Sequence, residues 1–285
     1  MKNLKLSPGL LFLLAGLAAL GNLSTNIILP SFSAIAASFA VTTRELGFTI
    51  TSFFVAFAIG QLLVGPVSDR YGRKWTVLVG SFVFVAGSLL CASADSLPAL
   101  VAGRFLQALG ACATSVMSRA IARDLFEGAD LSRVLAMTMV AMAAAPGFSP
   151  LLGGLLEAQF GWHSSFVVTA VFAVVLAVQL LSSLGETLSR DRRSNIMLGA
   201  TLTQYIRLTT DPQFVRPATT VALVTGALYA LFTATPPILL DEFGLTPLQF
   251  GAFSACTVIV VFTAGLGVSQ KPMSVALPTS PRLYY

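Results

Sequence analysis

The chain has 285 residues, of which 55% are hydrophobic and only 10% are charged. Soluble domains carry about 25% charged residues, and disordered chains are rich in charge and poor in apolar side chains, so both classes are excluded. Three cysteines in a chain of this length exclude a disulfide scaffold. The composition is that of a protein that crosses a membrane several times.

Eight long segments almost free of Asp, Glu, Lys and Arg follow one another along the chain. A helix needs about 20 apolar residues to cross a bilayer, and each segment reaches that length. The segments are residues 6–43, 46–68, 75–94, 96–118, 134–156, 158–185, 217–240 and 243–270. None alternates apolar with polar residues as the strands of an outer-membrane barrel do. The pattern predicts an all-α polytopic membrane protein with eight spans.

The connections between the segments suggest a division into six spans and two spans. We interpret residues 1–185 as a six-helix transmembrane bundle and residues 186–216 as a cytoplasmic linker. Residues 217–267 would be the first two helices of a second bundle, and residues 268–285 an atypical tail. Within the linker, the mildly apolar stretch 196–206 favours a short helix that lies along the membrane surface.

Basic residues fall almost entirely on one side of these spans. With a cytoplasmic N-terminus, 15 of the 17 Lys and Arg residues lie inside, which predicts that both termini are cytoplasmic. The inside residues are Lys2, Lys5, Arg70, Arg73, Lys74, Arg119, Arg123, Arg133, Arg190, Arg192, Arg193, Arg207, Arg216, Lys271 and Arg282. Because they are scattered over separate loops, no nucleic-acid partner is expected.

A first motif lies between the second and third segments, at residues 65–74. Its candidate functional residues are Gly65, Asp69, Arg70, Gly72, Arg73 and Lys74. The two glycines are expected to permit a tight turn. The carboxylate is expected to meet a helix N-terminus or a nearby Arg, and the basic side chains to bind acidic groups or lipid phosphates. The alternative is an ordinary basic loop.

A second motif places Arg104 inside the fourth segment. An Arg in a span costs several kcal/mol, with estimates from about 3 to above 10, so it is expected to face protein or a water-filled cavity. Helical spacing puts Gln107, Ala111, Ser115 and Ser118 on the same face, as in a cavity wall. The alternative is that Arg104 extends to the membrane surface.

A third motif occupies residues 145–154 of the fifth segment. Pro146 and Pro150 remove backbone donors and are expected to bend the helix. Gly153 and Gly154 are expected to allow close helix approach. The alternative is a span that is merely kinked and packed.

Together with the stretch Leu23-Ser24-Thr25-Asn26-Ile27-Ile28-Leu29-Pro30, these motifs resemble the major facilitator superfamily, and more narrowly its Bcr/CflA-type drug:proton antiporters. The resemblance covers residues 10–266. It implies a transporter in the bacterial inner membrane that exports amphipathic small molecules by alternating access, with protons as the coupling ion. It also implies a monomer in contact with the lipid bilayer, no enzymatic activity, no cofactor and no metal.

The chain departs from that family in two places. Asn26 stands where the family carries an acid, and an amide cannot titrate. The family has twelve helices, whereas the helical pattern here stops after eight and gives way to Pro272, Pro278 and Pro281. We therefore expect an incomplete copy that does not transport by itself.

The resemblance predicts a substrate or proton pathway near mid-membrane, between the two halves. The candidate residues are Asn22, Asn26, Arg104, Gln107, Met142, Thr225, Tyr229 and Thr233. Methionine and aromatic side chains suit variable apolar cargo, but polar groups in spans also bond neighbouring helices. Two alternatives to drug efflux stay open: export of a specific metabolite such as a nucleoside or sugar, and a non-transporting truncated membrane protein.

Overall fold

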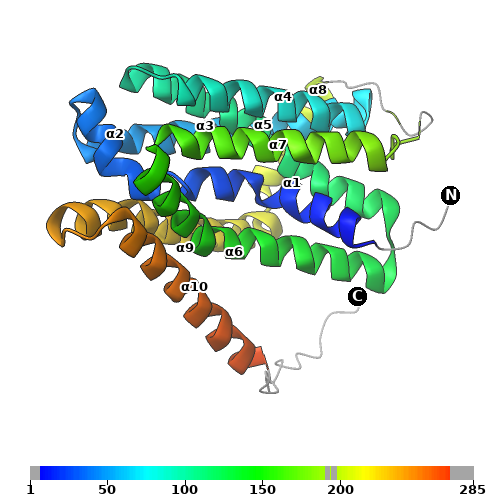
Figure 1. Ribbon diagram of the computed structural model, residues 1–285. Helices are drawn as coiled ribbons and strands as arrows, with labels where there is room; N and C mark the ends of the chain where they lie inside the picture. The colour runs from blue at the N-terminus through cyan, green and yellow to red at the C-terminus, as the bar shows by residue number, and fades with distance from the viewer. Residues whose placement is uncertain (1–6, 190–192, 194–197, 270–285) are drawn as a thin grey trace.

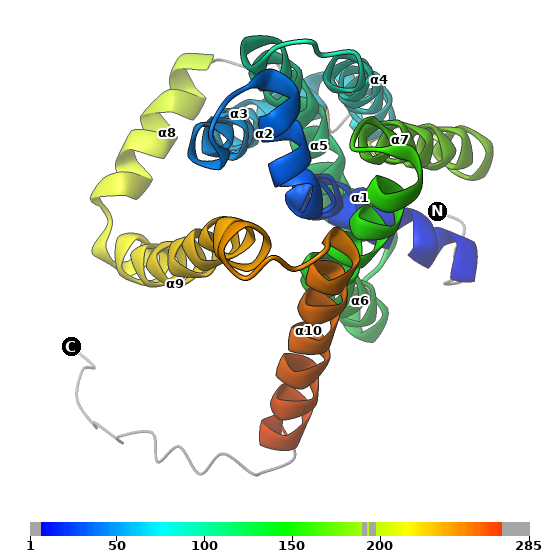
Figure 2. The same ribbon diagram turned by 60° about the vertical axis from the view of Figure 1, so that its left-hand side comes forward.

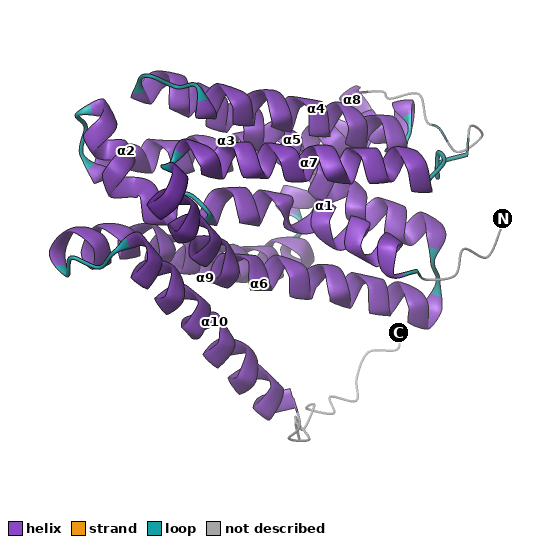
Figure 3. Ribbon diagram, in the orientation of Figure 1, coloured by secondary structure: helices purple, strands orange, loops and turns teal. Residues whose placement is uncertain are grey.

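The computed structural model describes residues 7–189, 193 and 198–269, and in these residues the chain is helical without a strand (Figure 3). The elements are α1 (Pro8–Asn26), η1 (Leu29–Ser31), α2 (Phe32–Phe39), α3 (Thr43–Tyr71), α4 (Arg73–Ala92), α5 (Leu97–Leu125), α6 (Gly128–Phe160), α7 (His163–Ser183), α8 (Leu198–Thr210), α9 (Pro212–Pro236), η3 (Pro237–Glu242) and α10 (Pro247–Ser269). The predictions for Lys2, Lys5, Arg190, Arg192, Lys271, Arg282 and the tail from residue 270 lie outside the described residues.

The predicted fold class is confirmed. Within the described residues, seven stretches are helical, long and apolar enough to cross a membrane, and α10 adds a further apolar helix. α1 and α3 to α7 form the six-helix bundle, with α1 packed against α5, α6 and α7 (Figures 1 and 2). Leu13, Leu14 and Leu17 of α1 have no exposed surface, as expected of a helix that is apolar on all sides.

The first span is broken, although its charge-free segment reads as one continuous run. α1 ends at Asn26, and the chain passes through the 3₁₀ turn η1 before α2 begins at Phe32. Pro30 causes the break because it has no N–H to donate to the carbonyl of Asn26, four residues earlier. The consequence is that Asn26 lies at the very end of a helix, inside the bundle.

Several helices extend beyond the charge-free segments that predicted them. α5 continues to Leu125, and α6 begins at Gly128 rather than at residue 134. Long charged side chains near a helix end extend to the polar surface, so a charge does not mark the end of a helix. α9 begins at Pro212 rather than 217, where the Asp211 carboxylate accepts a hydrogen bond from the Gln213 N–H at 2.9 Å.

The two ends of the bundle differ in structure. We call the end with the start of α1, the Gly72 turn and the end of α7 the basic end, and the other the opposite end. At the opposite end α10 packs against α6, and toward the basic end it diverges from α6 (Figure 1). α8 and α9 lie along one side of the bundle, and α8 lies next to α3 (Figure 2).

α4 and α5 approach unusually closely along a line of small residues. A Cβ atom on Gly87 would collide with the backbone of Gln107, and one on Gly110 would collide with the backbone of Gly80 and Phe84. The glycines recur at a spacing of seven on each helix, Gly80 and Gly87 on α4 and Gly103 and Gly110 on α5. This spacing of small residues is itself a sequence signal for close helix packing.

Candidate functional site

α1, α6 and α9 meet at the side chain of Asn22. Its Nδ2 donates to the Met142 carbonyl at 2.9 Å, and its Oδ1 accepts from the Tyr229 hydroxyl at 3.4 Å. The Asn26 Nδ2 donates to the backbone carbonyl of Asn22 at 2.7 Å. We call these four residues the asparagine junction. It joins the six-helix bundle to the first helix that follows the linker.

Pro146 explains why the Met142 carbonyl is available to Asn22. In an α-helix this carbonyl accepts from the N–H four residues later, and a proline there has none. A carbonyl left unpaired in a buried site costs about 1–3 kcal/mol. Asn22 supplies the missing donor. The sequence predicts that Pro146 bends the helix, and in the structure Pro146 also leaves an acceptor inside the bundle.

Tyr229 also has an aromatic neighbour beside an open cavity. Its ring contacts the Phe54 ring of α3 edge-on, with the centroids 4.6 Å apart. Both rings line a cavity of about 420 Å³ between α3 and α9, together with Ile50, Thr51 and Val55. Two rings and a polar edge suit a largely apolar molecule held by a few hydrogen bonds. Phe54 was not predicted, because nothing in the sequence distinguishes it from the other phenylalanines.

Arg104 belongs to a second polar cluster, which has no exposed surface. Its Nη1 donates to the Ser24 carbonyl of α1 at 3.1 Å and to Gln107 Oε1. Gln107 Nε2 in turn donates to Ser88 Oγ of α4 at 2.8 Å. We call Ser24, Ser88, Arg104 and Gln107 the arginine network. It connects α1, α4 and α5 in the middle of the bundle.

Arg104 faces protein, as expected of an Arg inside a span, but one detail of its prediction is wrong. Its helix face does not line a cavity, because Arg104, Gln107 and Ser118 are fully buried. The same burial rules out a side chain that extends to the membrane surface. Arg104 contacts the first span through the Ser24 carbonyl, and no hydrogen bond joins it to Asn22 or Asn26 within the described residues.

The charge of Arg104 is balanced without an acid. Its guanidinium carbon lies 4.4 Å from the centroid of the Phe53 ring, a cation–π contact. Its Nε and Nη2 have no hydrogen-bond partner among the described residues. Phe53 and Ser88 had no signal in the sequence, whereas Ser24 belongs to the stretch Leu23–Pro30 that carries the family resemblance. The positive charge therefore rests on a ring, a carbonyl and an amide.

The predicted pathway residues thus form two separate groups. Asn22, Asn26, Met142 and Tyr229 make up the asparagine junction, while Arg104 and Gln107 belong to the arginine network. Thr225 lies exposed on α9. The side chain of Thr233 is outside the described residues.

The motif at residues 65–74 forms a compact ionic cluster at the basic end. Gly72 makes the turn between α3 and α4 with φ +100°, and a Cβ atom there would collide with the Glu186 carboxylate. Arg73 pairs with Asp69 at 2.7 Å and with Asp124 of α5 at 3.4 Å. One expectation fails: Gly65 makes no turn, because it lies inside α3.

The same cluster fastens the end of α7 to the start of α4. Glu186 Oε1 accepts from the backbone N–H of Arg73 at 2.8 Å, which satisfies a free donor of the first turn of α4. Lys74 Nζ donates to the Leu184 carbonyl at 2.6 Å. Arg70 is exposed and stacks on the Tyr71 ring, 5.3 Å from its centroid.

α6 is held between two helices by its glycine pair. A Cβ atom on Gly153 would collide with the Ile27 carbonyl at the end of α1, and one on Gly154 with the Pro247 carbonyl at the start of α10. Gly251 of α10 lies equally close to α6, since a Cβ atom there would stand 2.5 Å from the Leu151 Cα. α6 thus packs closely on two sides, against the end of α1 and against α10, in the half of the bundle nearer the opposite end.

At the opposite end, hydrogen bonds join η3, which follows the linker, to α2 and α3, which precede it. The Asp241 carboxylate of η3 accepts from Ser33 Oγ of α2 at 2.6 Å and from Thr43 Oγ1 of α3 at 2.8 Å. No pattern in the sequence distinguishes Asp241 from the other acidic residues. Because α10 diverges from α6 toward the basic end (Figure 1), the arrangement is closed at one end and splayed at the other.

Curated relatives of this chain include several drug-resistance proteins. It is 37% identical to the uncharacterized MFS-type transporter YdgK of Bacillus subtilis over 85% of this chain and 60% of that protein. It is 28% identical to a bicyclomycin resistance protein homolog of Haemophilus influenzae over 94% of this chain and 67% of that protein. Multidrug resistance protein D of Escherichia coli is also 28% identical, over 69% of this chain and 49% of its own length.

Solved structures with the same fold are membrane transporters. A bacterial homolog of the human lysosomal transporter Spinster, in an inward-facing and unoccupied conformation, superposes with a TM-score of 0.72 over 93% of this chain and 63% of its own, at 16% identity. A D-xylose–proton symporter gives 0.61 over 91% of this chain and 66% of its own, at 17% identity. The sequence pattern of the Major Facilitator Superfamily matches residues 11–278, and the chain belongs to this family of membrane transporters.

Proposed function

We propose that the protein acts as a secondary active transporter that exports amphipathic small molecules, drugs among them, by alternating access. The observation that carries the proposal is the asparagine junction, which joins the six-helix bundle to α9 beside an aromatic cavity. The drug-resistance relatives support the direction of transport and the class of cargo. The chain spans only about three fifths of its Bacillus relative, so the proposal concerns the whole transporter to which these residues belong.

The proposal includes an orientation in the bacterial inner membrane. The basic end, with Arg70, Arg73 and Lys74, would face the cytoplasm, as the positive-inside rule requires. The splay of α10 from α6 would then open toward the cytoplasm, and the Asp241 contacts would close the periplasmic side. This is the arrangement in which a transporter loads cargo from inside the cell.

Cysteine labelling tests the orientation in intact cells. A Cys256→Ser background removes the exposed native cysteine, while Cys91 and Cys112 are buried. Single cysteines then replace Asp95, in the α4–α5 turn at the opposite end, or Glu127, between α5 and α6 at the basic end. A membrane-impermeant maleimide should label the first site only, and labelling of the second site alone would reverse the orientation.

Binding to the purified chain tests the cargo class, because it needs the asparagine junction but no complete transport cycle. The probes are chloramphenicol, tetraphenylphosphonium and uridine, which represent a neutral drug, a cationic drug and a specific metabolite. Drug binding should weaken about tenfold in Asn22→Ala, which loses two hydrogen bonds at the junction. Saturable binding of uridine alone would favour a metabolite exporter.

A tyrosine pair provides the matched control for this experiment. Tyr229→Phe removes a hydroxyl from the junction, whereas Tyr205→Phe removes a hydroxyl that bonds the Leu62 carbonyl on the outside of α3. Drug affinity should fall in the first variant and stay unchanged in the second. If Asn22→Ala and Tyr229→Phe both bind drugs as the parent chain does, the junction is not the cargo site. Proton coupling is tested in cells, where a protonophore should abolish export by the whole transporter.

A further inference from the structure

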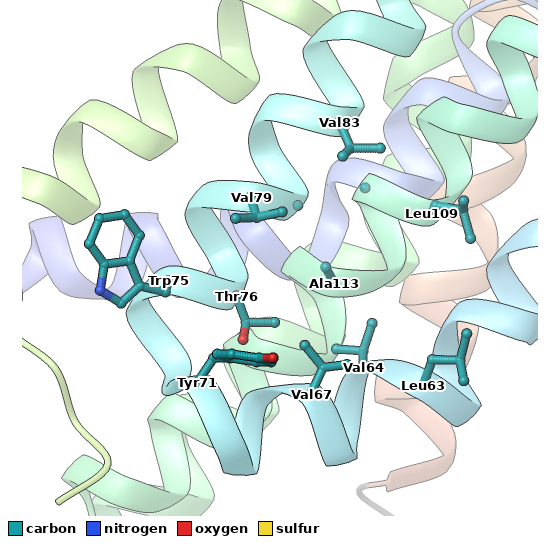
Figure 4. A pocket seen from close by; sticks show the side chains of 12 residues that line it. Leu63, Val64, Val67, Tyr71, Trp75, Thr76, Val79, Val83, Leu109 and Ala113 are labelled. Atoms are coloured by element: carbon teal, nitrogen blue, oxygen red, sulfur yellow. The ribbon is translucent and has the colours of Figure 1, made fainter. Parts of the chain in front are cut away.

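A large cavity lies on the outer side of the six-helix bundle, away from the asparagine junction. It has a volume of about 690 Å³ and forms a groove between α3 and α4, with α5 at its back (Figure 4). Its walls are almost wholly apolar, with Leu63 and Val67 on one side and Val79 and Val83 on the other. None of its lining residues belongs to the junction or to the arginine network.

The floor of the groove is deep because its residues are small. Gly80, Gly110 and Ala113 line it, where α4 and α5 are in closest contact. α3 and α4 stand apart above this floor, and the side chains of Leu63, Val67 and Val79 remain exposed. An apolar groove open to the bilayer holds lipid chains, because leaving it empty forfeits van der Waals contacts.

The dimensions of the groove match one leaflet of a bilayer. The stretch of α3 from Leu63 to Tyr71 rises about 12 Å, and the hydrocarbon core of one leaflet is about 15 Å thick. Tyr71 and Trp75 stand at the basic end of the groove with 55% and 64% of their surfaces exposed (Figure 4). Exposed aromatic rings of this kind are enriched at the level of lipid headgroups.

A cation without an acidic partner lies at the headgroup end. Arg73 is neutralised by Asp69 and Asp124, but Arg70 is exposed, stacks on Tyr71 and takes part in no salt bridge among the described residues. Lys74 is bound by carbonyl oxygens rather than by a carboxylate. The end of the groove therefore carries uncompensated positive charge next to its aromatic pair.

We propose that the groove binds one anionic glycerophospholipid, with an acyl chain between α3 and α4 and its phosphate on Arg70. Charge selects the lipid class, since a zwitterionic headgroup gains less from an uncompensated Arg. The separation of the groove from the asparagine junction argues against transported cargo. By holding α3 against α4 beside the Gly72 turn, the bound lipid stabilises the ionic cluster at the basic end.

Native mass spectrometry of the purified chain in detergent counts the lipids that remain bound. Dioleoyl phosphatidylglycerol should be retained as one molecule and bind about fivefold more tightly than dioleoyl phosphatidylcholine, as expected for one basic side chain near an anionic headgroup. Glycerol phosphate without acyl chains should not compete. Equal retention of the two lipids would overturn the proposal.

Matched variants separate the headgroup from the chain. Arg70→Gln should abolish the preference for phosphatidylglycerol, whereas Arg133→Gln, an exposed Arg at the start of α6, should keep it. Val79→Trp should fill the groove and reduce retention of both lipids, whereas Val171→Trp on the exposed face of α7 should not. Val67→Trp repeats the filling from the α3 side if Val79→Trp does not fold.

A phosphatidylglycerol with a photoreactive group at the end of an acyl chain identifies the site directly. Labelled peptides should come from α3, α4 and α5, and labelling should fall in Val79→Trp. Labelling confined to α9 or α10 would place the lipid elsewhere. If chloramphenicol displaced the lipid and labelled the same peptides, the groove would be a cargo site. If the parent chain formed a stoichiometric dimer that Val79→Trp lost, the groove would be a protein interface.

Discussion

The asparagine junction and the arginine network are both polar clusters that involve α1 of the six-helix bundle, yet they have different surroundings. All four residues of the arginine network are buried among the helices, and Arg104 has no accessible surface. The asparagine junction ends at Tyr229, which lines an open cavity between α3 and α9. A polar residue in a span is therefore no guide to a binding site until its exposure is known.

The two clusters also differ in which groups provide the hydrogen-bond partners. In the arginine network α4 and α5 contribute side chains and α1 contributes a carbonyl, which fixes the packing of the three helices. In the junction one amide serves a carbonyl freed by Pro146 and a hydroxyl from a separate part of the chain. We infer that the network has a structural role, and that the junction is the part that responds to cargo.

The largest effect on this comparison is expected from Gln107→Leu. The change leaves the Arg104 guanidinium and the Ser88 hydroxyl without their amide partner in a site that water does not reach. The free energy of unfolding should fall by about 2–3 kcal/mol, the cost of a lost bond to a buried charge. Unfolding in mixed micelles, followed by circular dichroism, measures it.

Gln179→Leu is the matched control, since the side chain of this half-buried glutamine of α7 donates to the carbonyl of Gly9 at the basic end. It should cost less than 1 kcal/mol, near the ordinary value of about 0.5–1.5 kcal/mol for one hydrogen bond. Equal losses in the two variants would mean that the arginine network is no more important to the fold than a peripheral bond.

A second prediction concerns Asn26, which is buried at the end of α1, two residues from the Arg104 partner Ser24. Asn26→Asp introduces a group that titrates close to the Arg104 guanidinium, which has no acidic partner among the described residues. Drug affinity in this variant should change by up to about tenfold per pH unit, the limit for one linked proton, and the parent chain should change much less. Binding isotherms between pH 5 and 8 give the comparison. Identical pH profiles would show that position 26 is not coupled to the junction.

The third prediction addresses closure at the opposite end. Asp241→Asn weakens two hydrogen bonds to a carboxylate, from Ser33 and Thr43, and should let this end open more often. A cysteine placed at Ala34 on α2 should then react about fivefold faster with a maleimide, which corresponds to about 1 kcal/mol. Glu242→Gln changes an adjacent exposed acid and should leave the rate unchanged. A faster rate in both variants would assign the effect to the lost charge rather than to the two hydrogen bonds of Asp241.

The smallest effect is expected where a proline frees a carbonyl on the outside of the bundle. Pro66 has no N–H for the Leu62 carbonyl, which accepts from the Tyr205 hydroxyl of α8 at 3.1 Å. Water or lipid headgroups can replace this exposed donor more readily than they can replace Asn22 at the part-buried Met142 carbonyl. Tyr205→Phe should speed hydrogen exchange in α8 and change the free energy of unfolding by less than about 0.5 kcal/mol. A loss as large as that of Gln107→Leu would remove the distinction between buried and exposed sites.

The sequence alone determined the fold class and the approximate spans, and it predicts which end of the bundle faces the cytoplasm. The cost of placing charge in a bilayer acts on each residue separately, so the apolar segments and the position of Lys and Arg are legible without a structure. The turn at Gly72 and the close approach at Gly153 and Gly154 were also predictable, because each depends on the absence of a Cβ atom.

Only the tertiary structure decided which polar groups meet. Asn22 and Arg104 read alike in the sequence, as polar residues at helical spacing in apolar spans. One reaches Met142 and Tyr229 beside a cavity, and the other is enclosed with Ser24, Gln107 and the Phe53 ring. These partners lie 80 to 207 residues apart in three of the contacts. Their choice depends on how helices pack and where prolines free a carbonyl, which no local pattern records.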